Sequence, residues 1–209
     1  MYMYGSIIVL IIAYVWNMQY NHPIVPKFLL EEFPWKTGDL VLLHAYDNFN
    51  ATFIGSYFTL CGIVVIDEGI PMLFEANGIE GMTLLEHHPK NGIFYSELIP
   101  RLQKYKGKVF VRPCIIDIDP MRELALKEFI HYAKKTFYYD ISVFVNGIKK
   151  YFGLKRCDHA TDCGQITFLS MLCLGIIHID EYYKPIAHHL RYIVTVPGYD
   201  SILELKDHP

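Results

Sequence analysis

The segment 60–76, LCGIVVIDEGIPMLFEA, decides the fold class. It contains two nearly all-apolar runs on either side of Asp67, Glu68 and Gly69, residue types that favour a tight turn. Apolar runs of this length, rich in isoleucine and valine and joined by a short turn, are typical of a β-hairpin. The segment therefore predicts two antiparallel strands, at residues 60–66 and 71–76.

Other strands are predicted on both sides of this hairpin. The run LVLLH at residues 40–44 follows a Gly-Asp turn signal. The run VFVRPCIIDI at residues 109–118 is interrupted by Pro113, which favours a sheet edge or a bulge. A last extended piece is expected at residues 192–196, before a charged tail.

A helix is predicted to begin after Asp119. Aspartate is a favoured N-cap residue, and Pro120 suits the first helical position because its φ angle is already helical. The spacing of apolar residues predicts which side chains of this helix face the core. They are Met121, Leu124, Phe129 and Ala133.

A second helix is predicted from residue 161 or 162 to residue 176, with Cys163 in its first turn. Because it is apolar on nearly every face, we expect it inside the fold. The positive end of the helix dipole favours a thiolate at Cys163, and hence a nucleophile, although a free cysteine in an apolar helix is also a common core residue. A nucleophilic thiol needs a base, usually a histidine, and a group that orients this base.

The composition excludes several classes of protein. A chain of 209 residues with 52% hydrophobic content can bury one sizeable core. A net charge of -3 provides no basic surface for phosphates, so nucleic acid is not an expected partner. Five cysteines without paired spacing predict free thiols in a reducing compartment.

The N-terminal residues predict attachment to a membrane. Residues 1–26 carry no charged side chain, and residues 5–16 (GSIIVLIIAYVW) are almost continuously apolar with flanking aromatic residues. The segment lacks a basic start and a cleavage site, so we predict an uncleaved single-pass anchor over residues 1–20, with a buried first helix of the domain as the alternative. Residues 21–37, which contain three prolines, are predicted to be a linker, and residues 38–209 the folded domain.

The order of several short motifs resembles the circularly permuted NlpC/P60 papain-like family, which includes YiiX/YaeF-like peptidases and lecithin:retinol-acyltransferase-like enzymes. The motifs are GDLVL at 38–42, GIVV at 62–65, FEA at 74–76, FYYD at 137–140 and DC at 162–163. The resemblance implies an α+β, papain-like fold in which an antiparallel sheet packs on helices, here with an N-terminal membrane helix.

The resemblance also implies catalytic roles. Cys163 matches the nucleophile of the family, and Glu75 matches the group that orients the base. The family's histidine stands two residues before the glycine-isoleucine pair, and that position is Leu60 here. A leucine cannot accept a proton, so the site has either degenerated or recruited another histidine.

Two histidines are candidates for a relocated base. His44 ends the predicted strand 40–44, and His159 lies four residues before Cys163. Either residue could equally be an ordinary exposed or core-edge histidine. No metal or cofactor is predicted, because Cys157, His159 and Cys163 lack a fourth zinc ligand and the adjacent His-His pairs cannot share one helix face.

Two functions from different classes follow. The first is a membrane-anchored thiol hydrolase or acyltransferase that acts on amide or ester bonds through Cys163, with peptide or lipid substrates. The second is a catalytically inactive structural or interaction protein that keeps the fold and binds a protein partner. A membrane- or capsid-associated virion protein of a large DNA virus would be an example of the second class.

Overall fold

The computed structural model describes residues 27–45, 58, 60–77, 92–105, 107–139, 160–161, 163–177 and 198–206. These residues form an α+β fold with a seven-stranded sheet in the order β1-β9-β6-β2-β3-β4-β5. Its strands are β1 (Lys27–Leu29), β2 (Leu40–Ala45), β3 (Leu60–Asp67), β4 (Ile70–Ala76), β5 (Ile93–Glu97), β6 (Gly107–Arg112) and β9 (Leu203–Lys206). The helices are α3 (Leu98–Gln103), α4 (Pro120–Thr136) and α6 (Cys163–Cys173), and β7 (Tyr138–Tyr139) pairs with β8 (Ala160–Thr161) in a second small sheet.

The predicted hairpin is confirmed as β3 and β4. Their antiparallel register places Gly62 opposite Glu75 and Ile63 opposite Phe74. The turn between them uses Gly69 at a φ of 82°, a left-handed conformation that glycine adopts without steric cost. All neighbouring strands of the large sheet are antiparallel except β1 and β9, so the prediction of an α+β fold with an antiparallel sheet packed on helices is confirmed.

Contacts with the helices distinguish the two faces of the sheet. Cys61 Sγ lies 3.3 Å from Thr167 Oγ1 of α6, and the ring of Phe74 packs edge-on against Phe129 of α4 at 6.0 Å between centroids. Because side chains alternate along a strand, Cys61 and Phe74 point to the same side, which α4 and α6 cover. We call this side the α6 face.

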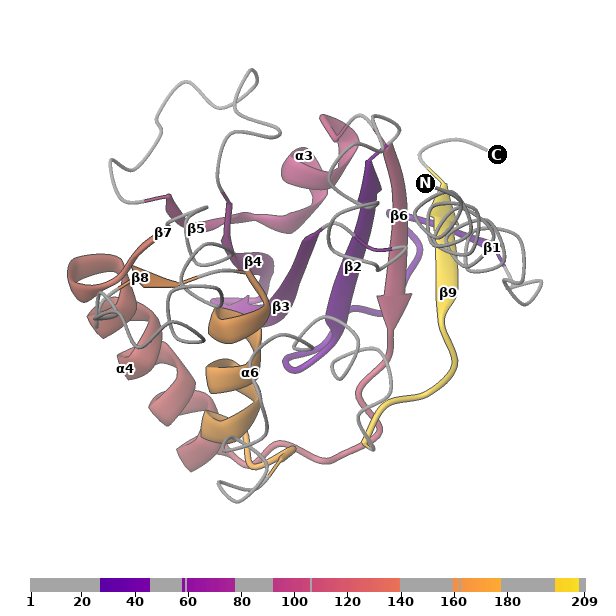
Figure 1. The fold of residues 1–209 in the computed structure, drawn as a ribbon. Coiled ribbons are helices and arrows are strands. Elements are labelled where there is room, and N and C mark those ends of the chain that lie inside the picture. Colours follow the sequence, from indigo (N-terminus) through magenta and orange to yellow (C-terminus); the bar gives the residue numbers. More distant parts are fainter. Residues whose placement is uncertain are drawn as a thin grey trace, which may run out of the picture.

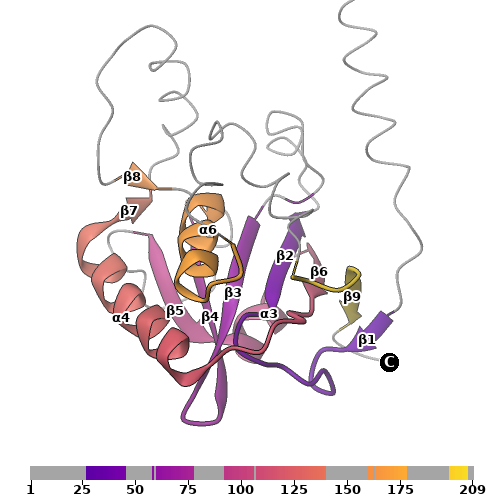
Figure 2. The same ribbon diagram turned by 90° about the horizontal axis from the view of Figure 1, so that it is seen from below.

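Helix α3 covers the opposite side, which we call the α3 face. Glu75 follows Phe74 on β4 and points the other way, where Arg101 of α3 donates from Nε to its Oε1 at 2.6 Å. Figures 1 and 2 show this arrangement, with α4 and α6 together on one side of β3 and β4 and α3 on the other side.

Helix α4 begins as predicted, and two of its four predicted core residues are confirmed, because Ala133 is buried and Phe129 packs against the core. Asp119 is the N-cap, and its Oδ1 accepts a hydrogen bond from the backbone N–H of Arg122 at 3.0 Å. The predicted core residues Met121 and Leu124 are 73% and 50% exposed. The buried stripe is Leu126, Ile130 and Ala133, at the i, i+4, i+7 spacing of one helix side.

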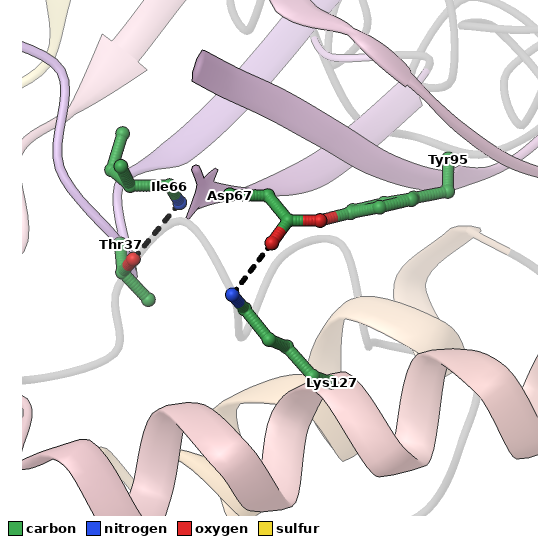
Figure 3. A network of polar contacts seen from close by, with 5 residues as sticks. All are labelled: Thr37, Ile66, Asp67, Tyr95 and Lys127. Atoms are coloured by element: carbon green, nitrogen blue, oxygen red, sulfur yellow. Dashed lines mark hydrogen bonds and ion pairs between the residues drawn. The ribbon is translucent and has the colours of Figure 1, made fainter. Parts of the chain in front are cut away.

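Polar contacts join α4 to the turn between β3 and β4 (Figure 3). Asp67 at the end of β3 accepts from Lys127 Nζ of α4 at 2.6 Å and from the hydroxyl of Tyr95 on β5 at 3.1 Å. Beside it, the backbone N–H of Ile66 donates to Thr37 Oγ1 at 3.0 Å. The contact of Lys127 joins the middle of α4 to the end of β3.

The N-terminal boundary of the packed domain lies before the predicted position. β1 pairs in parallel with β9, and Leu30 and Phe33 are buried, so residues 27–37 belong to the domain and do not form the predicted linker. Residues 1–26, where we predicted the anchor, lie outside the described residues. Within the described part of the chain, no helix is long and apolar enough to cross a membrane.

The C-terminal residues also differ from the prediction. The charged tail contributes β9, which pairs with β6 and places β6 inside the sheet. Pro113 directly follows β6 and ends that strand, where we had expected a sheet edge or a bulge. Arg112 holds the returning chain, because its Nε donates to the carbonyl of Asp200 at 3.2 Å and its guanidinium lies 5.3 Å from the centroid of the Tyr199 ring. The strand predicted at residues 192–196 lies outside the described residues.

Candidate thiol site at the start of α6

Cys163 is the first residue of α6, and its side chain is buried. The chain enters the helix from β8, which pairs in parallel with β7 at the end of α4. The first N–H groups of a helix have no acceptor within the helix, so they create a positive end beside the Cys163 sulfur. The predicted position of Cys163, in the first turn of a buried helix, is therefore confirmed.

The contact between Thr167 and Cys61 sets the position of this helix on the sheet. Thr167 is four residues after Cys163, so the two side chains lie on the same side of α6, one helical turn apart. Cys61 is the second residue of β3. Cys163 therefore lies over the α6 face, one turn from the contact with β3.

The other end of α6 lies near the start of β2. Ile176, just after the helix, and Ile116, just after β6, both come within 3.2 Å of the position that a Cβ on Gly198 would occupy. Cys114, two residues before Ile116, packs in the same way against Gly38, which is two residues before β2. Because the C-terminal end of α6 lies where β2 begins, its N-terminal end points toward the edge where β2 ends and β3 begins (Figure 2).

His44 lies on the same face and at the same end of the sheet. Leu42 of β2 is directly opposite Cys61, so it points to the α6 face, and His44 two residues later points the same way. His44 is the penultimate residue of β2, and its side chain is 7% exposed. The sheet thus directs a buried imidazole toward the side on which α6 presents Cys163.

Residues of β6 continue this surface beyond His44. Lys108 is directly opposite His44, and Phe110 is directly opposite Leu42. The ring of Phe58 packs edge-on against Phe110 with 5.3 Å between centroids. His44 is therefore directly opposite a lysine on β6, and the aromatic pair lies opposite Leu42, two residues earlier on β2.

Leu60 and Glu75, the positions taken from the family pattern, lie on the wrong face for this site. Leu60 precedes Cys61, and Glu75 pairs with Gly62, so both side chains point to the α3 face. Glu75 is fully buried, and its two carboxylate oxygens accept from Nε and Nη2 of Arg101 at 2.6 and 3.4 Å. We therefore correct the assignment of Glu75: it is half of a buried ion pair and does not orient a base beside Cys163.

No sequence pattern indicated the partner of Glu75. Arg101 comes from α3, a short helix that no sequence pattern predicted. Residue spacing within a helix cannot indicate that one of its side chains pairs with a residue of a separate strand. The contact between Thr167 and Cys61 did have a signal. Thr167 lies four residues after Cys163 in an apolar helix, and a polar residue at that spacing marks the side of the helix that carries the thiol.

The turn before β2 is fixed by a buried carboxylate. Asp39 Oδ1 accepts from the backbone N–H of Cys114 at 2.9 Å, and Oδ2 accepts from that of Lys36 at 2.9 Å. Burial raises the pKa of Asp39 to about 6, although both hydrogen bonds act in the opposite direction. This residue of the Gly-Asp motif therefore has a structural role.

Two other described cysteines, Cys114 and Cys173, have thiols whose charged form is disfavoured by burial. Burial raises the pKa of the Cys114 thiol and of the Cys173 thiol at the last position of α6. A raised pKa keeps a thiol protonated and poorly nucleophilic. All four cysteines of the described residues are free, as the sequence predicted.

The remaining predicted residues cannot be placed. His159, Cys157 and the two His-His pairs lie outside the described residues. Within the described ranges, no group of three or more histidine, cysteine, aspartate or glutamate side chains could hold a metal ion.

The chain was compared with protein families, curated proteins and solved structures. No family model matches the chain, and no curated protein matches it. Among solved structures, it is similar to the metalloprotein YiiX from Escherichia coli O157:H7, with a TM-score of 0.47 and 16% identity over 82% of this chain and 89% of that chain.

Proposed function

We propose that this chain is a papain-like thiol enzyme that acts on amide or ester bonds, with Cys163 as the nucleophile and His44 as the base. One observation carries the proposal. Helix α6 presents Cys163, and strand β2 presents His44, on the same face and toward the same end of the sheet. Thiol catalysis requires a thiol and a base that accepts its proton. Here the thiol lies at the start of α6 and the base is a buried imidazole on β2.

The chemistry follows from these two groups. The imidazole accepts the proton of the Cys163 thiol, and the thiolate attacks the carbonyl carbon of an amide or ester. The tetrahedral oxyanion can be stabilised by backbone N–H groups in the first turn of α6, which have no acceptor within the helix. The imidazolium then gives its proton to the leaving amine or alcohol, which leaves a thioester on Cys163. Water or a second acceptor, deprotonated by His44, attacks the thioester and regenerates the thiol.

We further propose that the apolar segment 5–16 attaches this enzyme to a membrane. Its continuous apolar residues and flanking aromatic side chains suit the boundary between hydrocarbon and water. Attachment would place the thiol near lipid or lipid-linked acyl groups as well as membrane-associated peptides.

Alkylation of the protein with iodoacetamide across pH tests the proposal, with the modified peptides quantified by mass spectrometry. Cys173 is a matched internal control, because it lies at the opposite end of the same helix. We expect Cys163 to be alkylated faster than Cys173 at neutral pH, because the helix start and an imidazole base both favour its thiolate. His44→Gln should raise the midpoint pH of Cys163 alkylation and leave the Cys173 profile unchanged.

Two results would overturn the proposal. The first is a Cys163 that reacts no faster than Cys173 at neutral pH. The second is a Cys163 profile that is the same in the native protein and in the His44→Gln variant. Either result would favour the non-catalytic class of function.

A further inference from the structure

Glu75 of β4 lies on the α3 face, on the opposite side of the sheet from the proposed base His44. The charged and titratable side chains that lie near His44 on the α6 face, within the described residues, belong to four other elements. They are Lys108 on β6, Glu204 on β9, Cys61 on β3 and Cys163 on α6. Glu204 is the one carboxylate in this set.

The strand register places His44, Lys108 and Glu204 on three neighbouring strands, β2, β6 and β9. Lys108 is directly opposite His44 in the pair β2–β6, and Glu204 is directly opposite Phe110 in the pair β6–β9. Lys108 and Phe110 are two residues apart, so they share a face, and Glu204 shares it with them. His44, Lys108 and Glu204 therefore point to the same side of β2, β6 and β9.

The ion pair between Lys108 and Glu204 orients the lysine side chain toward β9. Lys108 Nζ lies 3.9 Å from Glu204 Oε1, so the ammonium is held on the side of β6 that faces away from His44. Directly opposite residues have Cβ atoms about 4.5–5.5 Å apart, which would otherwise let a lysine ammonium reach the imidazole. Glu204 is 15% exposed and Lys108 is 40% exposed, so water screens this pair only partly.

We propose that Glu204 is a positioning residue: by holding the Lys108 ammonium on the β9 side of β6, it keeps that cation away from His44 and lets the imidazole accept the proton of Cys163. This inference rests on the proposed function, because it assigns a role to Glu204 only if His44 is the base. A positive charge beside an imidazole disfavours the imidazolium. The thiolate of Cys163 needs that imidazolium as its counter-ion.

The test is the pH profile of Cys163 alkylation in four variants. Glu204→Gln frees the ammonium, and we expect the midpoint for Cys163 to rise by about 0.5 to 1 pH unit. Lys108→Met should not raise the midpoint, because it removes the cation. In the Lys108→Met background, Glu204→Gln should have little further effect. Glu97→Gln, an exposed glutamate on β5 at the opposite edge of the sheet, is the matched control and should leave the profile unchanged.

The outcomes separate this inference from the proposed function. If His44→Gln raises the midpoint but Glu204→Gln does not, the role of Glu204 is wrong and the proposed function stands. The role of Glu204 is also wrong if Glu204→Gln shifts the midpoint by the same amount in the native protein and in the Lys108→Met variant. If His44→Gln has no effect, the proposed function fails and this inference fails with it. Urea unfolding of each variant checks that a shifted profile belongs to folded protein.

Discussion

Cys61 Sγ of β3 and Thr167 Oγ1 of α6 lie 3.3 Å apart in the interior, and this contact joins the helix that carries Cys163 to the central hairpin. Both residues are fully buried. Interiors are packed closely, so a larger side chain at this contact cannot be accommodated without movement of the helix. The position of Cys163 relative to His44 therefore depends on a small side chain at position 61.

We expect Cys61→Leu to lower the free energy of unfolding by about 1–3 kcal/mol, because it overpacks the space between β3 and α6. It should also slow the alkylation of Cys163, since the helix start moves away from β2. Cys61→Ala is the control, because it removes the sulfur without adding volume and should keep the Cys163 pH profile. If Cys61→Leu leaves the profile of Cys163 unchanged, the contact does not set the position of the thiol.

The ion pair between Glu75 and Arg101 gives a prediction about stability alone. Glu75→Gln leaves a buried guanidinium without its carboxylate, which should cost about 3–5 kcal/mol in the free energy of unfolding. The double variant Glu75→Gln with Arg101→Met should recover most of this loss. Urea unfolding measures both changes.

The same variant tests the corrected role of Glu75. Because Glu75 points to the α3 face, Glu75→Gln should leave the midpoint for Cys163 alkylation unchanged at urea concentrations where the variant is folded. A shift as large as that of His44→Gln would return Glu75 to the thiol site and contradict the assignment of the two faces.

Asp39 should make stability depend on pH between about 4 and 6. Burial raises the pKa of Asp39 from its ordinary 3.8 to about 6, so the folded protein keeps this proton where the unfolded chain has released it. The contribution of Asp39 to the free energy of unfolding therefore falls by roughly 3 kcal/mol as the pH rises through this window, and is constant on either side of it.

Asp39→Asn isolates this contribution from those of other groups. The asparagine oxygen can accept only one of the two backbone hydrogen bonds in the same way, so we expect a less stable variant. Its unfolding free energy should lack the part of the pH slope that belongs to Asp39. Urea unfolding of both proteins at several pH values between 4 and 7 measures the difference, and parallel pH curves would contradict the raised pKa of Asp39.

Two leucines of α4 distinguish its buried side from its exposed side. Leu126 is fully buried and Leu124 is 50% exposed, although they are two residues apart. Leu126→Ala should cost about 2–5 kcal/mol, while Leu124→Ala should change stability by less than about 0.5 kcal/mol. Thermal or urea unfolding measures both costs. If Leu124 faced the core, as the sequence predicted, Leu124→Ala would be the more destabilising of the two substitutions.

Local signals in the sequence were sufficient for half of the described elements, namely β2, β3, β4, β6, α4 and α6. The apolar runs and turn of the hairpin predicted β3 and β4, and Asp119 with Pro120 predicted the start of α4. These signals work because turn residues and caps act over a few neighbouring residues. Sequence also identified Cys163 at the start of a buried helix and named His44 as one candidate base.

Only the tertiary structure decided which residues could share a site. An alternating strand offers two faces, and spacing alone does not say which face receives α6 and which receives α3. The contact of Cys61 with Thr167 and the pairing of Glu75 with Arg101 settle this choice. Cys163 was evident as a sequence position, but its relation to His44 depends on long-range packing between a helix and a sheet far apart along the chain.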